Sequence, residues 1–264
     1  MDKIDLAVVF WFYKEPEICI NRLELIKKYN PDIKIFGVFG GKQSEENLYK
    51  EKLGEYLDDF YTHPSTDSEW KWIHGDLMLL DWYKDRGINL PWNSVVIVQW
   101  DMLVFDSFEK QFPDIKKDEM FMSGLQPLDK YTEENWEWTS PKHEFRNDFD
   151  NFLLYIKEKY GYVKSNLPCC LFILEIMPRI FFEKYLTVEN KEIGMLEYKI
   201  PIYAEIFSIP IYKKDVGAQW WEDVNTKPIN AEPTEIKTEY IEQELQKKNG
   251  WRIFHPYFKI WEKN

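Results

Sequence analysis

The sequence predicts an α/β fold in a single domain, with one mixed, mostly parallel sheet flanked by helices. Strand-like and helix-like segments alternate through the first half of the chain, which is typical of strand–helix–strand units with right-handed crossovers. The chain has 264 residues, of which 44% are hydrophobic, so it is long enough to bury a substantial core. We find no internal repeat, low-complexity tract or clear domain boundary.

The first half predicts five strands and three helices. Asn30-Pro31 is a stop signal for the first helix, Ser44 opens the second in a weak capping-box pattern with Asn47, and Gly87 closes the third. Strands are expected at 6–12, 33–41, 58–63, 94–101 and 120–128, and helices at 15–30, 44–57 and 68–87.

The second half is less regular. Residues 129–148 are polar, aromatic and rich in helix breakers, so we expect a long loop, and such loops are often functional. After it we expect a helix at 148–160, a strand at 167–174, a helix at 179–186, a helix followed by a strand at 194–215, a helical stretch at 232–250 and an aromatic-basic segment at 251–261.

Composition limits the function classes. The net charge of −12 argues against a nucleic-acid partner, which usually requires a basic surface. Three sparse cysteines indicate a reduced, cytosolic chain, and the longest apolar runs are too short to span a membrane. Aromatic residues make up 17% of the chain. They suit either a tryptophan-rich core or platforms for flat ligands and sugar rings.

A carboxylate follows the most strand-like segment: Asp101 ends the run that begins at Ser94. The carboxyl ends of parallel strands share one edge of a sheet, where ligands bind, so Phe12 and Gly40-Gly41 should end near it. An acid there suits Mg²⁺ or Mn²⁺, with substrate phosphates completing the coordination shell. It suits a turn cap equally well. No glycine-rich nucleotide loop, nucleophile elbow or cysteine-based zinc spacing is present.

At this point the chain resembles glycosyltransferases of the GT-A fold, whose sheet is Rossmann-like. Gln99-Trp100-Asp101 is similar to their Asp-x-Asp motif, with Gln99 in place of the first acid. The resemblance implies that Asp101 holds Mn²⁺ or Mg²⁺, and Asp106 suits a second acid less well. It also implies a nucleotide-sugar-binding half at 1–128 and an acceptor-binding half at 129–264.

The resemblance further implies donor contacts, and each of these residues also has a plain structural explanation. A late histidine on the metal corresponds to His255, which is equally compatible with a structural role. The implied donor-binding residues are Phe12, Tyr13, Glu15, Lys71, Asp76, Gln99, Trp100 and Lys259, with His74 as a further candidate on the helix that carries Lys71.

On the acceptor side, the family often has an x-Glu-Asp motif that supplies a general base in inverting enzymes. Glu197 matches its acid, with Tyr198 in place of the aspartate. Glu205 and the pair Glu222-Asp223 are the alternatives. The implied acceptor contacts are Asn135, Trp136, Trp138, Trp221 and Glu222, and those of the long loop would contact the acceptor or act as a lid.

The expected function is therefore the metal-dependent transfer of a sugar from a nucleotide-diphosphate donor to a carbohydrate or lipid-linked glycan acceptor in glycan biosynthesis. The expected mechanism is inverting if Glu197 is the base. The expected location is the cytoplasm or the inner face of a membrane, with weak surface contact through 251–261. The alternatives are a sugar-phosphate nucleotidyltransferase and a non-catalytic carbohydrate-binding protein.

Overall fold

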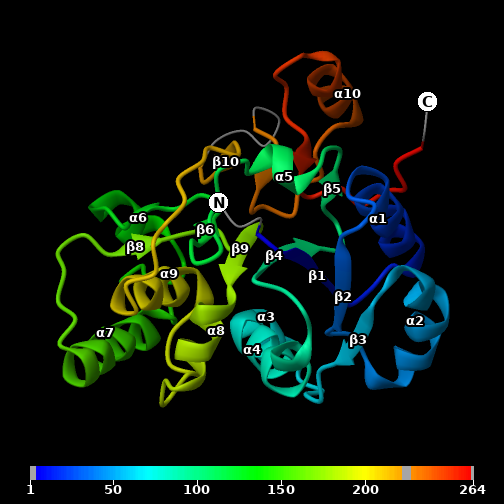
Figure 1. The fold of residues 1–264 in the computed structure, drawn as a ribbon. Helices are drawn as coiled ribbons and strands as arrows, with labels where there is room; N and C mark the ends of the chain where they lie inside the picture. Colours follow the sequence, from blue (N-terminus) through cyan, green and yellow to red (C-terminus); the bar gives the residue numbers. More distant parts are fainter. Residues whose placement is uncertain (1–3, 222–226, 263–264) are drawn as a thin grey trace.

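The computed structural model describes residues 4–221 and 227–262, and its centre is a six-stranded sheet in the order β3-β2-β1-β4-β9-β6 (Figure 1). Neighbouring strands are parallel from β3 to β4, whereas β9 runs antiparallel to both β4 and β6. The predicted mixed, mostly parallel α/β sheet is confirmed. The strands are β1 (Leu6–Phe12), β2 (Lys34–Phe39), β3 (Asp59–Thr62), β4 (Ser94–Gln99), β6 (Phe121–Met122) and β9 (Glu175–Pro178).

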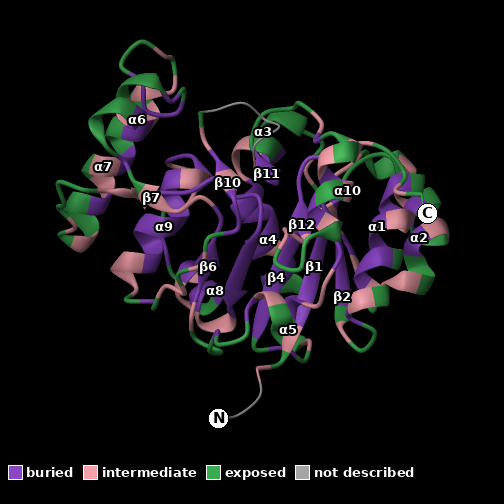
Figure 2. Cartoon of the chain, turned by 90° about the horizontal axis from the view of Figure 1, so that it is seen from above, coloured by how far each residue is buried: buried purple, intermediate pink, exposed green. Residues whose placement is uncertain are grey.

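Helices cover both faces of this sheet, because alternate side chains of each buried strand point to opposite sides. Val8, Phe10 and Phe12 of β1 pack in one cluster with α1 (Pro16–Tyr29) and α2 (Glu46–Leu53). Ala7 and Val9 pack in the other cluster, together with three further helices. These are α4 (Gly75–Asp85), α8 (Arg179–Leu186) and α9 (Leu196–Ile206). Figure 2 shows the sheet buried between these layers.

Shorter elements complete the described chain. The remaining helices are α3 (Ser68–Ile73), α5 (Phe108–Gln111), α6 (Lys130–Asn135), α7 (Arg146–Tyr160) and α10 (Thr238–Gln246), with 3₁₀ turns at Gln43–Glu45, Gly54–Tyr56 and Gly87–Asn89. The short strands are β5 (Leu103–Val104), β7 (Gln126–Pro127), β8 (Pro168–Cys169), β10 (Ala218–Gln219), β11 (Ile229–Asn230) and β12 (Ile253–Phe254).

The single helix predicted at 68–87 is wrong: the segment forms α3 and α4, which are separated at His74. His74 leaves the helical conformation, with φ −114° and ψ 40°. The next residue must be a glycine because of packing: a Cβ on Gly75 would lie 2.1 Å from the Trp11 ring. The break therefore lets an indole from β1 rest against the start of α4. The predicted Ser44 cap is also wrong, because the turn and helix that follow Ser44 have no side-chain cap.

From residue 120 onward, the structure corrects five predicted segments. The expected loop at 129–148 contains α6, whose first turn is capped by Asp129 through the Thr132 amide at 2.8 Å. The strands expected at 120–128 and 167–174 are interrupted by the positive φ angles of Gly124 and Phe172. After α9, the expected strand is reduced to a single bridge between Ile211 and Met120. The helical stretch at 232–250 is shorter than expected, since α10 begins at Thr238.

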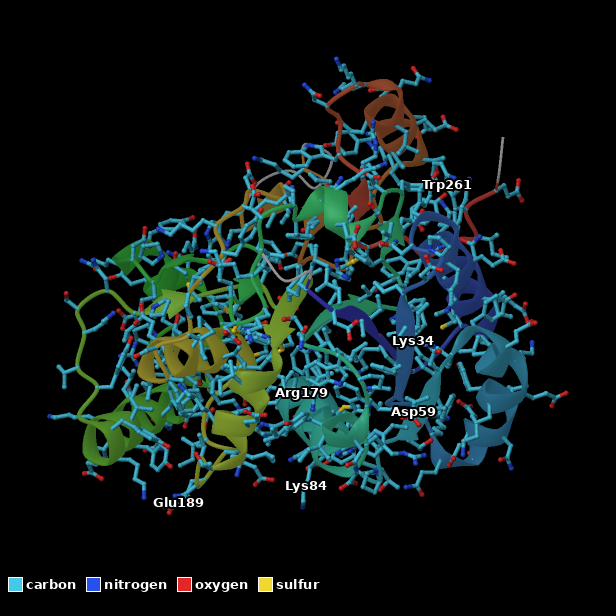
Figure 3. The ribbon with its side chains drawn as sticks, in the orientation of Figure 1. Lys34, Asp59, Lys84, Arg179, Glu189 and Trp261 are labelled. Carbon is cyan, nitrogen blue, oxygen red and sulfur yellow. The ribbon has the colours of Figure 1, made fainter. Side chains whose placement is uncertain are left out.

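Arg179, labelled in Figure 3, fixes the segment that precedes β4. Its guanidinium donates to the carbonyl oxygens of Leu90 at 2.6 Å, Ile88 at 3.1 Å and Trp92 at 3.1 Å. The same group lies 4.1 Å from the centre of the Trp92 ring. The first residue of α8 thus ties the antiparallel strand β9 to the entry of the central strand β4.

The late part of the chain returns to the end of β4. Strand β12 pairs antiparallel with β5, and the Phe105 amide donates to the Arg252 carbonyl at 2.7 Å. The Tyr257 amide donates to the Asp101 carbonyl at 2.8 Å. Residues remote in sequence are therefore fixed beside the carboxylate that follows the central strand.

Candidate active site

A pocket of about 540 Å³ opens at the carboxyl ends of β1, β2 and β4. Three further segments close it: α3, residues 231–233 and residues 255–258. Its lining consists of Trp11, Tyr13, Lys14, Gly40, Ser68, Lys71, Trp72, Met78, Gln99, Trp100, Asp101, Ala231, Glu232, Pro233, His255, Pro256 and Phe258. The pocket lies where the order of strands predicts a ligand site.

Asp101 and His255 meet in this pocket. Both residues are 7% exposed, and Oδ1 of Asp101 lies 3.3 Å from Nε2 of His255. The two atoms are not hydrogen-bonded to each other, since Asp101 Oδ1 is a buried oxygen with no hydrogen-bond partner among the residues that the structure describes. The structure therefore brings together the two residues that the sequence suggested for a metal.

The histidine tautomer explains why the contact is unusual. Nδ1 of His255 lies 3.0 Å from the carbonyl oxygen of Asn230, which can only accept, so Nδ1 carries the proton. In the neutral ring, Nε2 is then an acceptor that faces the acceptor Oδ1 of Asp101. A cation or a proton between them would relieve this repulsion.

The donor set fits a divalent cation. Two ligands that bind one ion at adjacent positions, each about 2.1 Å away, lie roughly 3.0–3.4 Å apart, as these two atoms do. Asn230 supplies the orienting contact that metal-bound histidines usually have. Within the described ranges, no three His, Cys, Asp or Glu side chains form a cluster that could hold a metal. The protein would thus provide two ligands, as Mg²⁺ sites completed by phosphates do.

Arg22 holds the segment that carries His255. This fully buried side chain on α1 donates from Nη2 to the carbonyl oxygens of Tyr257 at 2.8 Å and Lys259 at 2.7 Å. Burial lowers the pKa of Arg22 to about 10, against the opposing attraction of Asp101. The guanidinium therefore stays charged at neutral pH and fixes the backbone next to the Asp101–His255 pair.

Aromatic rings and one lysine form the outer part of the pocket. Trp100 stacks on Phe258 with centroids 5.8 Å apart and meets the exposed Tyr13 ring edge-on at 5.8 Å. The Lys14 amine lies 4.8 Å from the Trp100 ring centre and 5.3 Å from that of Tyr13. This arrangement offers flat faces and a positive charge close to Asp101.

Two other predicted donor residues line the pocket but are already engaged. Nε2 of Gln99 donates to the Phe172 carbonyl at 3.3 Å. The buried Lys71 amine donates to the carbonyl oxygens of Gly40 at 2.8 Å and Gly41 at 3.2 Å, and burial lowers its pKa. Lys71 thus fixes the turn after β2.

The structure places four other predicted donor residues away from the pocket lining. Phe12 is fully buried in the core, and Glu15 lies exposed at the start of α1. Asp76 is buried in an ion pair with Lys199 at 2.9 Å, and Lys259 pairs with Glu235 at 2.5 Å. The further candidate His74 is likewise absent from the lining; its pKa is lowered by burial.

The two candidate bases occupy different surroundings. Glu197 begins α9 outside the pocket lining, and its carboxyl accepts a hydrogen bond from Trp138, whose ring lies 5.1 Å from that of the pocket residue Trp72. Burial raises the pKa of Glu197 to about 8. Glu205 is in a surface ion pair with Lys164 at 2.8 Å and also accepts from Tyr162. The third candidate, Glu222-Asp223, lies outside the described residues.

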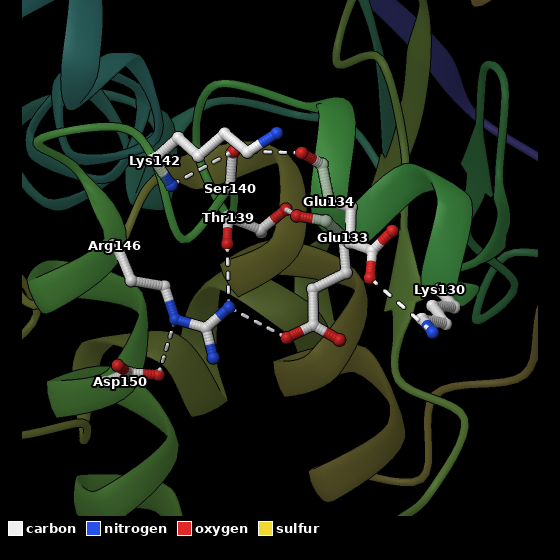
Figure 4. Close-up of polar contacts among 8 residues, drawn as sticks. All are labelled: Lys130, Glu133, Glu134, Thr139, Ser140, Lys142, Arg146 and Asp150. Carbon is white, nitrogen blue, oxygen red and sulfur yellow. Dashed lines mark hydrogen bonds and ion pairs between the residues drawn. The ribbon is translucent and has the colours of Figure 1, made fainter.

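Three of the predicted acceptor residues, Asn135, Trp136 and Trp138, lie in a segment that hydrogen bonds and ion pairs hold together. Figure 4 shows Arg146 donating to Glu133 at 2.8 Å, the Thr139 carbonyl at 2.9 Å and Asp150 at 2.9 Å. The Ser140 hydroxyl donates to the Glu134 carbonyl at 2.9 Å. Among the candidates themselves, Trp136 and Trp138 are buried, Asn135 and Trp221 are exposed, and Glu222 lies outside the described residues. This network opposes a lid movement of the segment.

Sequence reasoning missed several lining residues, among them Trp11, Lys14, Trp72, Glu232 and Phe258. Trp11 carried a readable signal, because strand alternation places it on the face opposite Phe12. Glu232 and Phe258 come from the late chain, and nothing in their local sequence indicates which strand end they approach.

No family model and no curated protein matches the sequence. Among solved structures, the chain is similar to mouse xyloside xylosyltransferase 1, with 8% identity, a TM-score of 0.43 and coverage of 95% of this chain and 97% of that one. It is similar to the WbbM bifunctional glycosyltransferase, with 9% identity and a TM-score of 0.46; 98% of this chain is covered but only 47% of WbbM.

A cytidylyltransferase from Leptospira borgpetersenii is also similar, with 10% identity, a TM-score of 0.41 and coverage of 80% of this chain and 77% of that one. These matches thus include glycosyltransferases, the enzyme class that the sequence resembles. At such TM-scores and identities they carry no conclusion about activity, which has to be argued from the pocket. In the described part of the chain, no helix is both long and apolar enough to cross a membrane.

Proposed function

We propose that this protein is a glycosyltransferase that uses a divalent cation, Mn²⁺ or Mg²⁺, and a nucleotide-diphosphate sugar. The observation that carries the proposal is the pair of buried acceptors, Asp101 Oδ1 and His255 Nε2, which face each other across 3.3 Å. They lie in a pocket of about 540 Å³ at the carboxyl ends of parallel strands. A cation bound there would satisfy both atoms and attract a diphosphate into an otherwise acidic protein.

The reaction would break the bond between the anomeric carbon of the sugar and the diphosphate oxygen, and would form a bond from that carbon to the acceptor oxygen. The cation would act as a Lewis acid on the charge that develops on the diphosphate. Asp101 and His255 would hold it. Lys14 would add a positive charge on the same side, and Tyr13, Trp100 and Phe258 would provide faces for the base and sugar.

The proton of the acceptor hydroxyl needs a base, and Glu197 is the candidate. With a pKa of about 8, its ionised form is a stronger base than an ordinary carboxylate. Glu197 is separated from the pocket by Trp138, which donates to its carboxyl and whose ring contacts the pocket residue Trp72. For an acceptor that enters beside Trp72, the rings of Trp72 and Trp138 would have to move aside before its hydroxyl reached this carboxyl. An inverting reaction would then follow from attack on the face opposite the diphosphate.

Calorimetric titration with UDP, GDP, CDP and ADP, each with Mn²⁺ and with EDTA, tests the proposal. We expect metal-dependent binding of at least one nucleotide, weakened about 100-fold or more in Asp101→Asn. Asp106→Asn is the matched control, because Asp106 bonds the Ser107 amide and Gln111 outside the pocket. Binding of no nucleotide, or full binding in Asp101→Asn, would contradict the proposal.

Product analysis separates the rival functions. A glycosyltransferase supplied with a bound nucleotide sugar releases the nucleoside diphosphate, by slow hydrolysis when no acceptor is present. A nucleotidyltransferase instead releases pyrophosphate from a nucleoside triphosphate and a sugar phosphate. A carbohydrate-binding protein without activity would bind sugars and release neither product.

A further inference from the structure

Two groups of contacting aromatic rings, joined by the chain from Trp136 to Trp138, form a row that leads away from the pocket. It begins at Trp72, which lines the pocket yet is 56% exposed, and which lies 5.1 Å from the buried Trp138. Two positions before Trp138, the buried Trp136 meets Trp220 edge-on at 5.1 Å. This buried part of the row supports the exposed rings described next.

The row ends in two exposed rings. Trp220 lies 5.9 Å from Trp221, and Trp221 meets Tyr131 edge-on at 5.8 Å with an interplanar angle of 88°. Trp221 is 45% exposed and Tyr131 is 60% exposed. Large exposed aromatic side chains that contact each other form an apolar patch, and such patches often mark sites of interaction. We refer to Trp221 and Tyr131 as the outer ring pair.

The outer ring pair is anchored on both sides. Tyr131 belongs to α6, which is capped by Asp129 and followed by the Arg146 network of Figure 4. Next to Trp221, the Trp220 indole donates to the Gly124 carbonyl at 2.9 Å. Rings held in place in this way lose little conformational entropy when a ligand binds.

The charge around the rings limits the ligand. Glu134 pairs with Lys130 at 3.7 Å, whereas Glu137 is exposed beside Trp136, and the whole protein carries a net charge of −12. An anionic chain would be repelled, and so would an anionic lipid surface. An uncharged sugar chain would not be repelled. Its sugar rings can place their apolar C–H faces on the aromatic rings, and its hydroxyl groups can hydrogen-bond to nearby carboxylates.

We propose that the outer ring pair is a binding site for the distal sugar units of an uncharged oligosaccharide whose terminal unit occupies the pocket beside Trp72. The acceptor is then a glycan chain, not a free monosaccharide. This inference depends on the proposed function for the identity of the chain as an acceptor, but the sugar site itself can be tested without catalysis.

Binding of neutral oligosaccharides of one to six units, from the maltose, cellulose, chitin and xylan series, tests the site on a glycan array and by calorimetry. We expect affinity for at least one series to rise about tenfold from the single sugar to the longer chains. Replacing both rings, Trp221→Ala with Tyr131→Ala, should remove that rise and leave Mn²⁺-dependent nucleotide binding unchanged. Leu154→Ala, an equally exposed residue on α7, is the control.

The site is overturned if no neutral series shows a rise with length, if the double variant keeps the rise, or if only uronic-acid oligomers bind. Failure of the proposed function is distinguishable from failure of this site. Length-dependent sugar binding without any nucleotide binding would support the outer ring pair and reject the glycosyltransferase. Metal-dependent nucleotide binding without a rise of sugar affinity with chain length would support the proposed function and reject the outer ring pair as a sugar site.

Discussion

Glu197 shows what a single residue gains from its surroundings. Its carboxyl lies at the start of α9 and accepts a hydrogen bond from the Trp138 indole, yet no cation is paired with it in the described residues. Burial dominates, so the neutral form is favoured and the pKa rises to about 8. The residue was selected from a short acidic pattern, whereas its unusual acidity depends on packing that the sequence does not reveal.

The raised pKa of Glu197 predicts a pH-dependent stability. Between its ordinary value of 4.5 and about 8, the folded protein retains a proton that the unfolded chain has lost. The stabilisation from this group is therefore complete below pH 4.5 and is lost as the pH rises toward 8. The test measures the free energy of unfolding in urea for Glu197→Gln and the wild type. The difference, variant minus wild type, should be more positive at pH 8 than at pH 4.5.

Glu205→Gln is the control for that measurement, because Glu205 forms a surface pair with Lys164. It should show no such gain at pH 8. Equal differences between Glu197→Gln and the wild type at the two pH values would show that the carboxyl ionises normally.

Strand alternation explains which aromatic residue of β1 reaches the pocket. Phe12 shares its face with Val8 and Phe10, toward α1, whereas Trp11 points to the other side and lines the pocket. Because alternate side chains of a strand point to opposite faces, the sequence of β1 was sufficient to exclude Phe12 as a ligand contact once Trp11 was placed at the pocket. No local pattern could have shown that Asp76 pairs with Lys199, since those residues lie on different helices far apart in sequence.

At the scale of secondary-structure elements, the break between α3 and α4 matters most to the pocket. It places Lys71 and Trp72 at the pocket on α3, while α4 continues below the sheet. The break accommodates the Trp11 ring over Gly75. The amphipathic pattern of 68–87 is compatible with one helix. The sequence therefore indicated which face of the helical segment is buried, but not the break at His74.

Substituting Gly75 tests this packing. In Gly75→Ala the new methyl group would lie 2.1 Å from the Trp11 ring, so this pocket-lining ring would have to move. We expect a loss of about 1–3 kcal/mol of stability and weaker nucleotide binding. Gly54→Ala is the matched control: its Cβ meets nothing within 4 Å and its φ is −58°, so it should be neutral or stabilising. Unchanged stability and binding in Gly75→Ala would contradict the packing argument.

The buried ion pair between α4 and α9 should be essential to their packing. The Lys199 amine lies 2.9 Å from Asp76 and donates to the Lys191 carbonyl at 2.9 Å, and both charged side chains are almost fully buried. Lys199→Met would leave an uncompensated carboxylate and should cost about 3–5 kcal/mol, measured by chemical unfolding. Lys34→Met, at the exposed pair with Asp58, should have little effect. Similar losses in both variants would contradict this view.

At the scale of the whole molecule, the sequence predicted the part of the fold that depends on local order. Strands β1 to β4 and helices α1, α2 and α8 follow apolar periodicity and clear stop signals, and they lie where expected. The second half was harder, because its strands are two to four residues long and are defined by partners elsewhere in the chain. Strand β9, for example, is specified by its antiparallel register with β4.

The candidate site likewise has one part that the local sequence indicates and one part that depends on the complete fold. Asp101 was identifiable because it follows a continuous buried strand, and the pairing with His255 was suggested by resemblance alone. Its geometric cause is the return of residues 253–258, fixed by β12 on β5 and by the Tyr257–Asp101 hydrogen bond. Such contacts between distant segments depend on the complete fold and have no signature in a short window of sequence.

The Tyr257–Asp101 hydrogen bond also has a consequence for protein synthesis. A nascent chain leaving the ribosome carries Asp101 long before Asn230, His255 and Tyr257 have been translated. Until then a cation would meet a single carboxylate, which holds it weakly. At the proposed site, cation capture would therefore be possible only once residues 255–257 have been translated and have folded back onto Asp101, so a chain that stops before residue 255 would not retain the ion.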